Sequence, residues 1–166
     1  MNATEQLIEK FYTSFQQKNW KEMQGCYDNE VTFSDPVFQH LKRKEVFAMW
    51  HMLVTAGKDL SLSFKNIKAN DNSGSCAWDA HYSFSRTGRK VHNIITAEFK
   101  FSNGKIIEHR DSFDLWRWSR LALGTSGIFL GWSPIVQNKI RGIAHSSLNK
   151  FIAEHPEYKD HRTITN

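Results

Sequence analysis

The sequence predicts an α+β domain in which N-terminal helices pack against a curved antiparallel sheet. Apolar side chains recur at helical spacing before residue 57, whereas residues 59–116 alternate between apolar and polar side chains and are broken by short turns. Helices followed by strands indicate an α+β domain, and a later helical pattern adds a C-terminal helix. The 166 residues are enough for one domain with its own core.

Three helices are predicted in the first part of the chain, at residues 3–17, around 20–27 and at 43–55. Thr4 is available as the N-cap of the first helix, and Gly57 follows the end of the third. Asp28 and Asn29 are typical of a turn. Residues 30–34 predict a short strand that ends at Asp35, because a residue before proline is restricted to extended geometry.

Four strands are predicted in the second part, at residues 59–69, 75–86, 89–101 and 104–116. Because successive side chains of a strand point to opposite faces, the last strand should carry two different faces. One face combines apolar and titratable side chains, namely Ile107, His109, Asp111 and Phe113. If this face lines a cavity, Asp111 is its candidate for chemistry.

The C-terminal part begins with a glycine-interrupted apolar segment at 116–132 that starts and ends with tryptophan. This segment is consistent with a lid, a dimer contact or an interfacial membrane anchor, and we expect a lid or dimer contact. Ser133 and Pro134 then indicate the start of a last helix running to about Glu154. The chain is therefore expected to form a single domain, 1–166, with a cone at 1–115, a lid segment and helix at 116–155, and a flexible tail at 156–166.

Composition and motifs argue against several classes of protein. The net charge of +5 comes from scattered cations, and the one tight cluster, at 41–44, lacks interleaved aromatic side chains, so we expect no nucleic-acid binding. No apolar run reaches the roughly 20 residues of a spanning helix, and no secretory pattern is present. We therefore expect a cytoplasmic protein without membrane contact. No histidine pair has helical ligand spacing beside a third ligand, so neither a metal nor a cofactor is predicted.

The stretch from Tyr27 to Pro36, read Tyr-Asp-Asn-Glu-Val-Thr-Phe-Ser-Asp-Pro, resembles the ketosteroid isomerase family. The resemblance implies that Asp35 corresponds to the catalytic base of that family. The family's two oxyanion donors fall on Phe11 and Ala97, neither of which can donate a hydrogen bond. Tyr12 points about 100° away from Phe11 on a helix, which makes it a poor substitute. Steroid isomerisation is therefore not expected.

The stretch from Asn103 to Asp114 is similar to limonene epoxide hydrolase, which carries a catalytic aspartate in a Gly-Lys-Ile…Arg-Asp…Phe-Asp strand. The resemblance places Asp111 at that aspartate. The hydrolase also uses an arginine and an aspartate on a neighbouring strand, where this chain offers Asp79 and His81 and no arginine. Its two water-holding residues fall on Phe33 and Asp35. Both families share the cone of nuclear transport factor 2 and the SnoaL-like polyketide cyclases, which implies this fold for residues 3–115.

These residues suggest cofactor-independent acid–base chemistry on a small hydrophobic ligand. Asp35 and Asp111 would carry protons, and His81 and His109 would position them or a water molecule. Two carboxylates in one apolar pocket are expected to have their pKa values pushed apart. The predicted pocket lining is Phe11, Tyr12, Phe33, Trp50, Asp79, Ala97 and Phe113.

Two alternatives remain open at this level. Asp35 could be a turn or cap residue, and Asp111 could form a structural ion pair with His81 or His109. A non-catalytic domain that binds a ligand and dimerises through its sheet would account for the same sequence. A homodimer is expected in either case.

Overall fold

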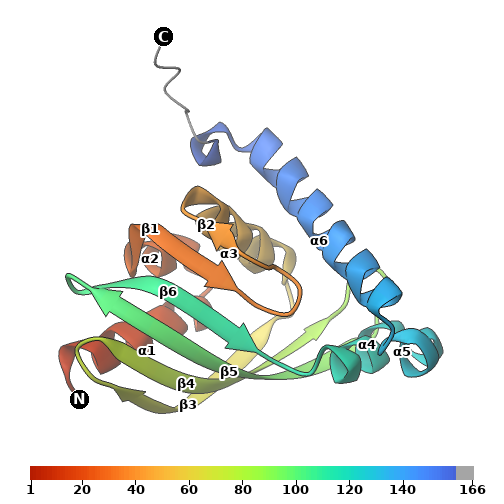
Figure 1. The fold of residues 1–166 in the computed structure, drawn as a ribbon, viewed down its shortest axis with the longest axis horizontal. Coiled ribbons are helices and arrows are strands. Elements are labelled where there is room, and N and C mark those ends of the chain that lie inside the picture. The colour runs from red at the N-terminus through yellow and green to blue at the C-terminus, as the bar shows by residue number, and fades with distance from the viewer. Residues whose placement is uncertain (160–166) are drawn as a thin grey trace.

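The computed structural model describes residues 1–159, which fold into a curved six-stranded sheet that wraps around N-terminal helices (Figure 1). The first helices are α1 (Ala3–Gln16), α2 (Trp20–Gly25) and α3 (Lys44–Ala56). The strands are β1 (Tyr27–Ser34), β2 (Leu41–Lys42), β3 (Ser61–Ala69), β4 (Ser73–Ser83), β5 (Lys90–Ser102) and β6 (Lys105–Ser112). The predicted α+β cone is confirmed.

The first helix begins at residue 3 as predicted, but its cap is Asn2 and not Thr4. The Asn2 side chain accepts a hydrogen bond from the Glu5 amide at 2.8 Å, and the Glu5 carboxylate accepts one from the Asn2 amide at 3.0 Å. This reciprocal pair is a capping box, which satisfies two free amides at once. The Thr4 hydroxyl instead donates to Asn2 Oδ1.

The sheet order is β2-β1-β6-β5-β4-β3, so the meander predicted from β3 to β6 is present. The strand β1 pairs in parallel with β6, which the local sequence pattern did not indicate. The turn expected at Asp28 and Asn29 is wrong, because both residues lie inside β1. Pairing with β6 shifts between Tyr27 and Thr32, so an irregularity in the ladder replaces the turn.

The strand β6 departs from strict alternation near its start. Phe101 pairs with Ile106 and Lys100 pairs with Glu108, which leaves Ile107 as the extra residue of a bulge. Ile106 is consequently fully buried beside His109 and Asp111, whereas Ile107 is only partly buried. The expected inner face is therefore correct from His109 onward and wrong at Ile107. The strand ends at Ser112, before the predicted residue 116, because Asp114 caps the next helix.

Three further helices follow the sheet: α4 (Leu115–Leu123), α5 (Thr125–Leu130) and α6 (Pro134–Glu154). We call residues 115–154 the C-terminal extension. Trp118 of α4 donates its indole hydrogen to the Tyr82 hydroxyl at 2.7 Å, which fastens α4 to the end of β4. Arg141 of α6 donates to the Pro36 carbonyl at 2.9 Å and holds the loop that follows β1. Ser133 caps α6 as predicted.

The predicted flexible tail begins with an ordered turn. Residues Pro156–Tyr158 form the 3-10 helix η1, in which Tyr158 is buried against α3. The rest of that prediction, from residue 160 onward, lies outside the described residues. Within residues 1–159, no helix combines the length and apolar character needed to cross a membrane.

Candidate active site

A chain of buried polar side chains crosses the interior of the cone. Trp50 of α3 donates its indole hydrogen to the Tyr27 hydroxyl at 2.9 Å, and that hydroxyl lies 2.7 Å from His109 Nδ1. His109 Nε2 in turn lies 3.0 Å from Asp111 Oδ1, which also accepts a longer hydrogen bond from Trp78. All five residues are buried, and His109 is fully excluded from solvent. The chain links α3, β1, β6 and β4 through one connected network.

One direction in this chain is fixed by chemistry. An indole nitrogen can only donate, so the Tyr27 oxygen accepts from Trp50. The two ring nitrogens of His109 are held between the Tyr27 hydroxyl and Asp111, so His109 orients the Asp111 carboxyl. A contact with His109 and a place in the interior are therefore both features of Asp111.

Asp35 lies just after β1, beside the β6 strand that carries Asp111. One of its carboxyl oxygens accepts hydrogen bonds from the Val37 and Phe38 amides, so it does close a turn. Burial nevertheless raises the pKa of Asp35 to about 7. The two amides work in the opposite direction, and the charge of Asp111 adds to the rise. A carboxyl with this pKa exchanges a proton readily at neutral pH.

Tyr12 of α1 places its hydroxyl in the same interior. The side chain is fully buried, and its oxygen has no hydrogen-bond partner among the described residues. Burial raises the pKa of Tyr12 well above its usual value, and the Asp111 charge contributes. Phe11 and Tyr12 both lie in the interior although they point in different directions, because α1 lies inside the cone and buries several of its faces. An unpartnered buried hydroxyl is costly, so a ligand oxygen could satisfy it.

His81 and Asp79 lie on the outer face of β4 and do not join this interior. The inward residues of β4 are Cys76, Trp78 and Ala80. His81 stacks on His92 of the neighbouring strand at 4.0 Å between ring centroids, and His92 Nε2 lies 3.4 Å from Asp79. The structure therefore separates His81 and Asp79 from Asp35 and Asp111, a choice between faces that the sequence left open.

Two side-chain clusters in the described part of the chain have ligand atoms close enough to hold a metal ion. They consist of Asp79, His81 and His92 on the outer sheet face, and of His51, His155 and Glu157 between α3 and η1. Both arise from residues brought together across the fold, which local ligand spacing cannot reveal. Neither cluster includes Asp35, Tyr12 or Asp111.

Aromatic rings pack closely around His109. Its ring centroid lies 4.4 Å from that of Phe99, 5.1 Å from Phe33 and 5.5 Å from Phe11. Trp50 stacks beside it, Ala97 is fully buried opposite Asp111, and Phe113 is partly buried. Of the predicted lining, Phe11, Tyr12, Phe33, Trp50 and Ala97 thus share the buried interior.

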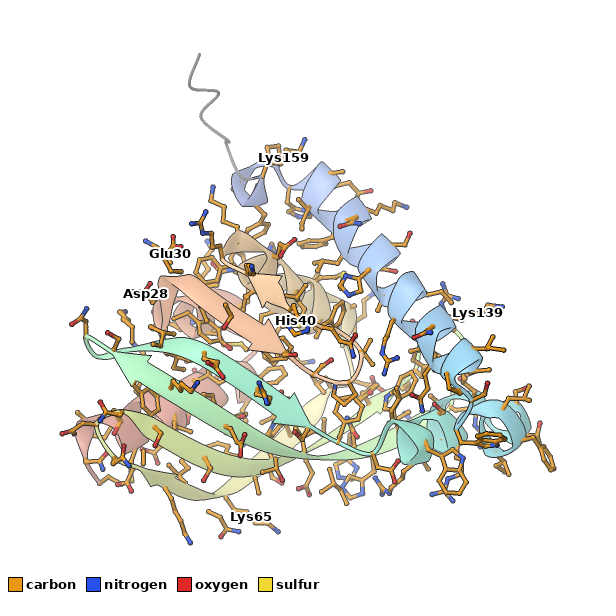
Figure 2. The ribbon with its side chains drawn as sticks, viewed as in Figure 1. Asp28, Glu30, His40, Lys65, Lys139 and Lys159 are labelled. Atoms are coloured by element: carbon orange, nitrogen blue, oxygen red, sulfur yellow. The ribbon has the colours of Figure 1, made fainter. Side chains whose placement is uncertain are left out.

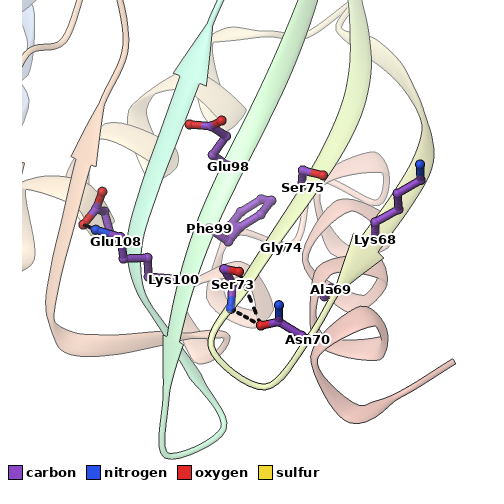
Figure 3. A pocket seen from close by; sticks show the side chains of 10 residues that line it. All are labelled: Lys68, Ala69, Asn70, Ser73, Gly74, Ser75, Glu98, Phe99, Lys100 and Glu108. Carbon is purple, nitrogen blue, oxygen red and sulfur yellow. Dashed lines mark hydrogen bonds and ion pairs between the residues drawn. The ribbon is translucent and has the colours of Figure 1, made fainter.

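Two hollows of the described surface lie elsewhere. One of about 510 Å³ is found at the ends of β3 to β6, near Asn70 and Glu108 (Figure 3). Another of about 540 Å³ lies between α2, α3 and η1, near Trp20 and Tyr158. Neither of these two hollows is lined by Asp35 or Asp111.

Sequence reasoning missed Tyr27, Trp78 and Asn93 as interior polar residues. The sequence pattern places Tyr27 at the end of the second predicted helix and in a family motif, whereas its place in β1 opposite β6 makes it the partner of His109. Asn93 is buried on the inner face of β5, between Val91 and Ile95. Its position in an alternating apolar run was the available signal, because a polar residue on a buried face needs a reason.

The profile of the SnoaL-like domain matches residues 8–109, more than half of the chain. The chain belongs to the SnoaL-like domain family. This match ends at His109, so it includes most of the cone but neither Asp111 nor the C-terminal extension. No curated protein matches the chain.

Solved structures share the fold of this SnoaL-like protein at low sequence identity. A nuclear transport factor 2-like protein of unknown function from Burkholderia pseudomallei is 13% identical with a TM-score of 0.64, over 73% of this chain and 98% of that one. A candidate polyketide cyclase from Xanthomonas campestris is 18% identical with a TM-score of 0.60, over 72% and 95%. An epoxide hydrolase of the limonene type from Mycobacterium tuberculosis is 13% identical with a TM-score of 0.57, over 81% and 95%. These similarities establish the cone.

Proposed function

We propose that this SnoaL-like protein performs cofactor-independent acid–base chemistry on a small hydrophobic substrate, of the isomerase, cyclase or hydrolase type. The observation that carries the proposal is a pair of neighbouring carboxyls held differently, Asp35 partly buried at the end of β1 and Asp111 buried on β6. Asp35 has a pKa near neutrality, whereas Asp111 is oriented by His109. Structural relatives include an epoxide hydrolase and a candidate polyketide cyclase, which is consistent with chemistry of this kind.

The proposed roles follow from the hydrogen-bond inventory. Asp35 takes a proton from a carbon or oxygen of the substrate and returns it at a second position. The Tyr12 hydroxyl, which has no hydrogen-bond partner within residues 1–159, donates to an oxygen on which negative charge develops. His109 is a positioning residue for Asp111, and Tyr27 and Trp50 fix the orientation of its ring. Apolar walls exclude water and strengthen each of these contacts.

Exchange of carbon-bound hydrogen for deuterium provides a test that does not require the natural substrate. A panel of small cyclic ketones in D₂O would be followed by NMR with the native protein and with Asp35→Asn. The exchange rate should fall by about 10²- to 10⁴-fold in the variant, the usual contribution of a general base. The native pH–rate profile should rise with a midpoint near 7, following the pKa of Asp35. An Asp79→Asn variant is the matched control, because Asp79 lies on the outer face.

The second candidate is a non-catalytic domain that binds a ligand and dimerises. The observation favouring it is the close packing of Phe99, Phe33 and Phe11 around His109, together with hollows that lie away from the carboxyls. In this case no ketone of the panel would exchange hydrogen for deuterium faster with the native protein than with Asp35→Asn. A small ligand that binds with the same affinity to both proteins would support this candidate over the enzyme.

A further inference from the structure

The helix α5 forms an exposed apolar surface at one end of the long axis of the molecule (Figure 1). Its glycines Gly127 and Gly131 are buried, and Gly127 approaches the backbone of Ser119 so closely that no side chain would fit. The large side chains therefore point outward. We call the apolar tip the five exposed residues Ile128, Phe129, Leu130, Trp132 and Ile135. Phe129 is 72% exposed and Ile135 is 80% exposed.

Exposure on this scale is unusual for neighbouring large apolar side chains. Single exposed apolar residues are common on soluble proteins, whereas contiguous groups mark a surface that meets another apolar phase. Trp132 sits at the edge of the group, and Trp116 is a further exposed ring of α4. Tryptophan is favoured where apolar and aqueous phases meet, because its ring is largely apolar and carries one polar N–H, which in Trp132 donates to the Phe129 carbonyl at 3.0 Å.

The segment that carries the tip has a one-sided charge. From Leu115 to Ala153 there is no aspartate or glutamate, and the cations are Arg117, Arg120, Lys139, Arg141 and Lys150. The Arg120 guanidinium lies 4.4 Å from the centre of the exposed Trp116 ring. Arg89, from the turn before β5, donates to the Leu121 carbonyl and adds another cation beside α4. Lys139 projects from α6 close to α5 (Figure 2).

We infer that the apolar tip docks on the surface of a bilayer that contains anionic phospholipids. Apolar side chains would enter the boundary between headgroups and acyl chains, and the surrounding cations would meet lipid phosphates. This is contact with a surface and requires no spanning helix. It replaces the expectation, drawn from the sequence, of a lid or dimer contact without a membrane.

The charge of the segment disfavours a second copy of the chain as the occupant. A twofold contact brings the same patch of each copy face to face. The segment would then set Arg117, Arg120 and Lys139 against their own copies without an acidic side chain from residues 115–153 to pair with them. An anionic bilayer supplies the missing charge as well as the apolar phase.

The position of the apolar tip also suits the proposed function. Only this point depends on the proposed function, and the docking itself does not. Trp118 of α4 bonds to Tyr82 and belongs to a hydrophobic cluster against which Val37 packs, and the Val37 amide donates to Asp35. The helix next to the tip therefore covers the Asp35 end of the interior. A hydrophobic substrate dissolved in the bilayer would reach the protein at this end.

Sedimentation with vesicles tests the docking independently of any activity. The native protein would be mixed with vesicles of phosphatidylcholine containing one quarter phosphatidylglycerol, and with vesicles of phosphatidylcholine alone. We expect binding to the anionic vesicles that weakens with added NaCl, as for any charge-assisted surface contact. The Phe129→Ser/Trp132→Ser double variant should bind at least ten-fold less. Arg120→Gln/Lys139→Gln should lose the preference for the anionic vesicles.

Ile94→Ser is the matched control, because Ile94 is 53% exposed on the outer face of the sheet, outside the tip. It should bind vesicles as the native protein does. Absence of native binding to anionic vesicles would overturn the inference, and so would equal binding by the tip variant. Light scattering on the same samples gives a further contradiction: a native dimer that becomes monomeric in the tip variant, without vesicle binding, would assign the tip to a contact between copies.

Discussion

The interior of the cone and the C-terminal extension treat polar and apolar groups in opposite ways. The interior buries a connected series of hydrogen-bonding side chains from Trp50 to Asp111, each with a partner. In the extension, large apolar side chains such as Phe129 are exposed to water, whereas glycines such as Gly127 make the close contacts between α4 and α5. The difference indicates that the side-chain interactions that stabilise the fold are concentrated in the cone. The exposed side chains of the extension are available for contacts with another surface.

Paired substitutions of tryptophan should show the largest contrast. Trp50→Ala removes a ring that is 2% exposed and leaves the Tyr27 hydroxyl without its donor, so we expect a loss of about 3–5 kcal/mol in the free energy of unfolding. Trp132→Ala removes a ring that is 65% exposed and should change it by less than about 0.5 kcal/mol. Urea unfolding monitored by circular dichroism measures both. Equal losses would remove the distinction between the regions.

Asp35 should make the cone sensitive to pH in a defined direction. Its pKa is raised from 3.8 to about 7 in the folded protein, so the folded state binds the proton more tightly than the unfolded state. The resulting stabilisation is fully present below pH 3.8 and is lost as pH rises to about 7. A shift of this size corresponds to a few kcal/mol, since one pKa unit is about 1.4 kcal/mol.

The measurement is the difference in unfolding free energy between the native protein and Asp35→Asn at several pH values. Asparagine keeps an oxygen that can accept from the Val37 and Phe38 amides but has no proton to lose. The native protein should therefore become less stable relative to the variant between pH 4 and pH 7. A constant difference across this range would show that Asp35 titrates normally.

The close approach of α4 and α5 should make the stability of the extension sensitive to substitution of its buried glycines. Substitutions in the exposed apolar tip should affect stability much less. A Cβ at Gly127 would lie 2.0 Å from the Ser119 carbonyl oxygen, so Gly127→Ala must separate α4 from α5. We expect a loss of about 1–3 kcal/mol, the usual range for overpacking. Gly142→Ala is the control, because no atom lies within 4 Å of its added Cβ and alanine favours the middle of α6 by about 1 kcal/mol. The midpoint temperature of thermal unfolding should therefore fall in Gly127→Ala and rise in Gly142→Ala.

Removing one hydroxyl tests whether the buried polar chain acts as a unit. Tyr27→Phe keeps the ring but leaves Trp50 Nε1 and His109 Nδ1 without their shared partner. A loss of about 1–3 kcal/mol is expected for an unsatisfied buried group. The His109 ring should also become free to change tautomer, which ¹⁵N chemical shifts would report. Unchanged stability and shifts would indicate that water replaces the hydroxyl.

Local patterns were sufficient to predict most elements of the cone, because periodicity and turn residues act over a few positions. The last strand and the cap at Ser133 are examples. The bulge at Ile107 was not predictable, because it depends on the register with β5. The same limit applies to the site. Asp35 and Asp111 were identified from short motifs, whereas the separation of His81 from them depends on which face of β4 turns inward.

The parallel pairing of β1 with β6 also has a consequence for folding. Tyr27 and His109 are 82 positions apart, so their hydrogen bond closes a long loop of chain. Closing such a loop is entropically unfavourable until other contacts repay it, and pairings of this kind slow folding. During synthesis, β1 emerges early and must wait for nearly all of the meander before its neighbour exists. We therefore expect the hairpins from β3 to β6 to form first and the candidate site to assemble last.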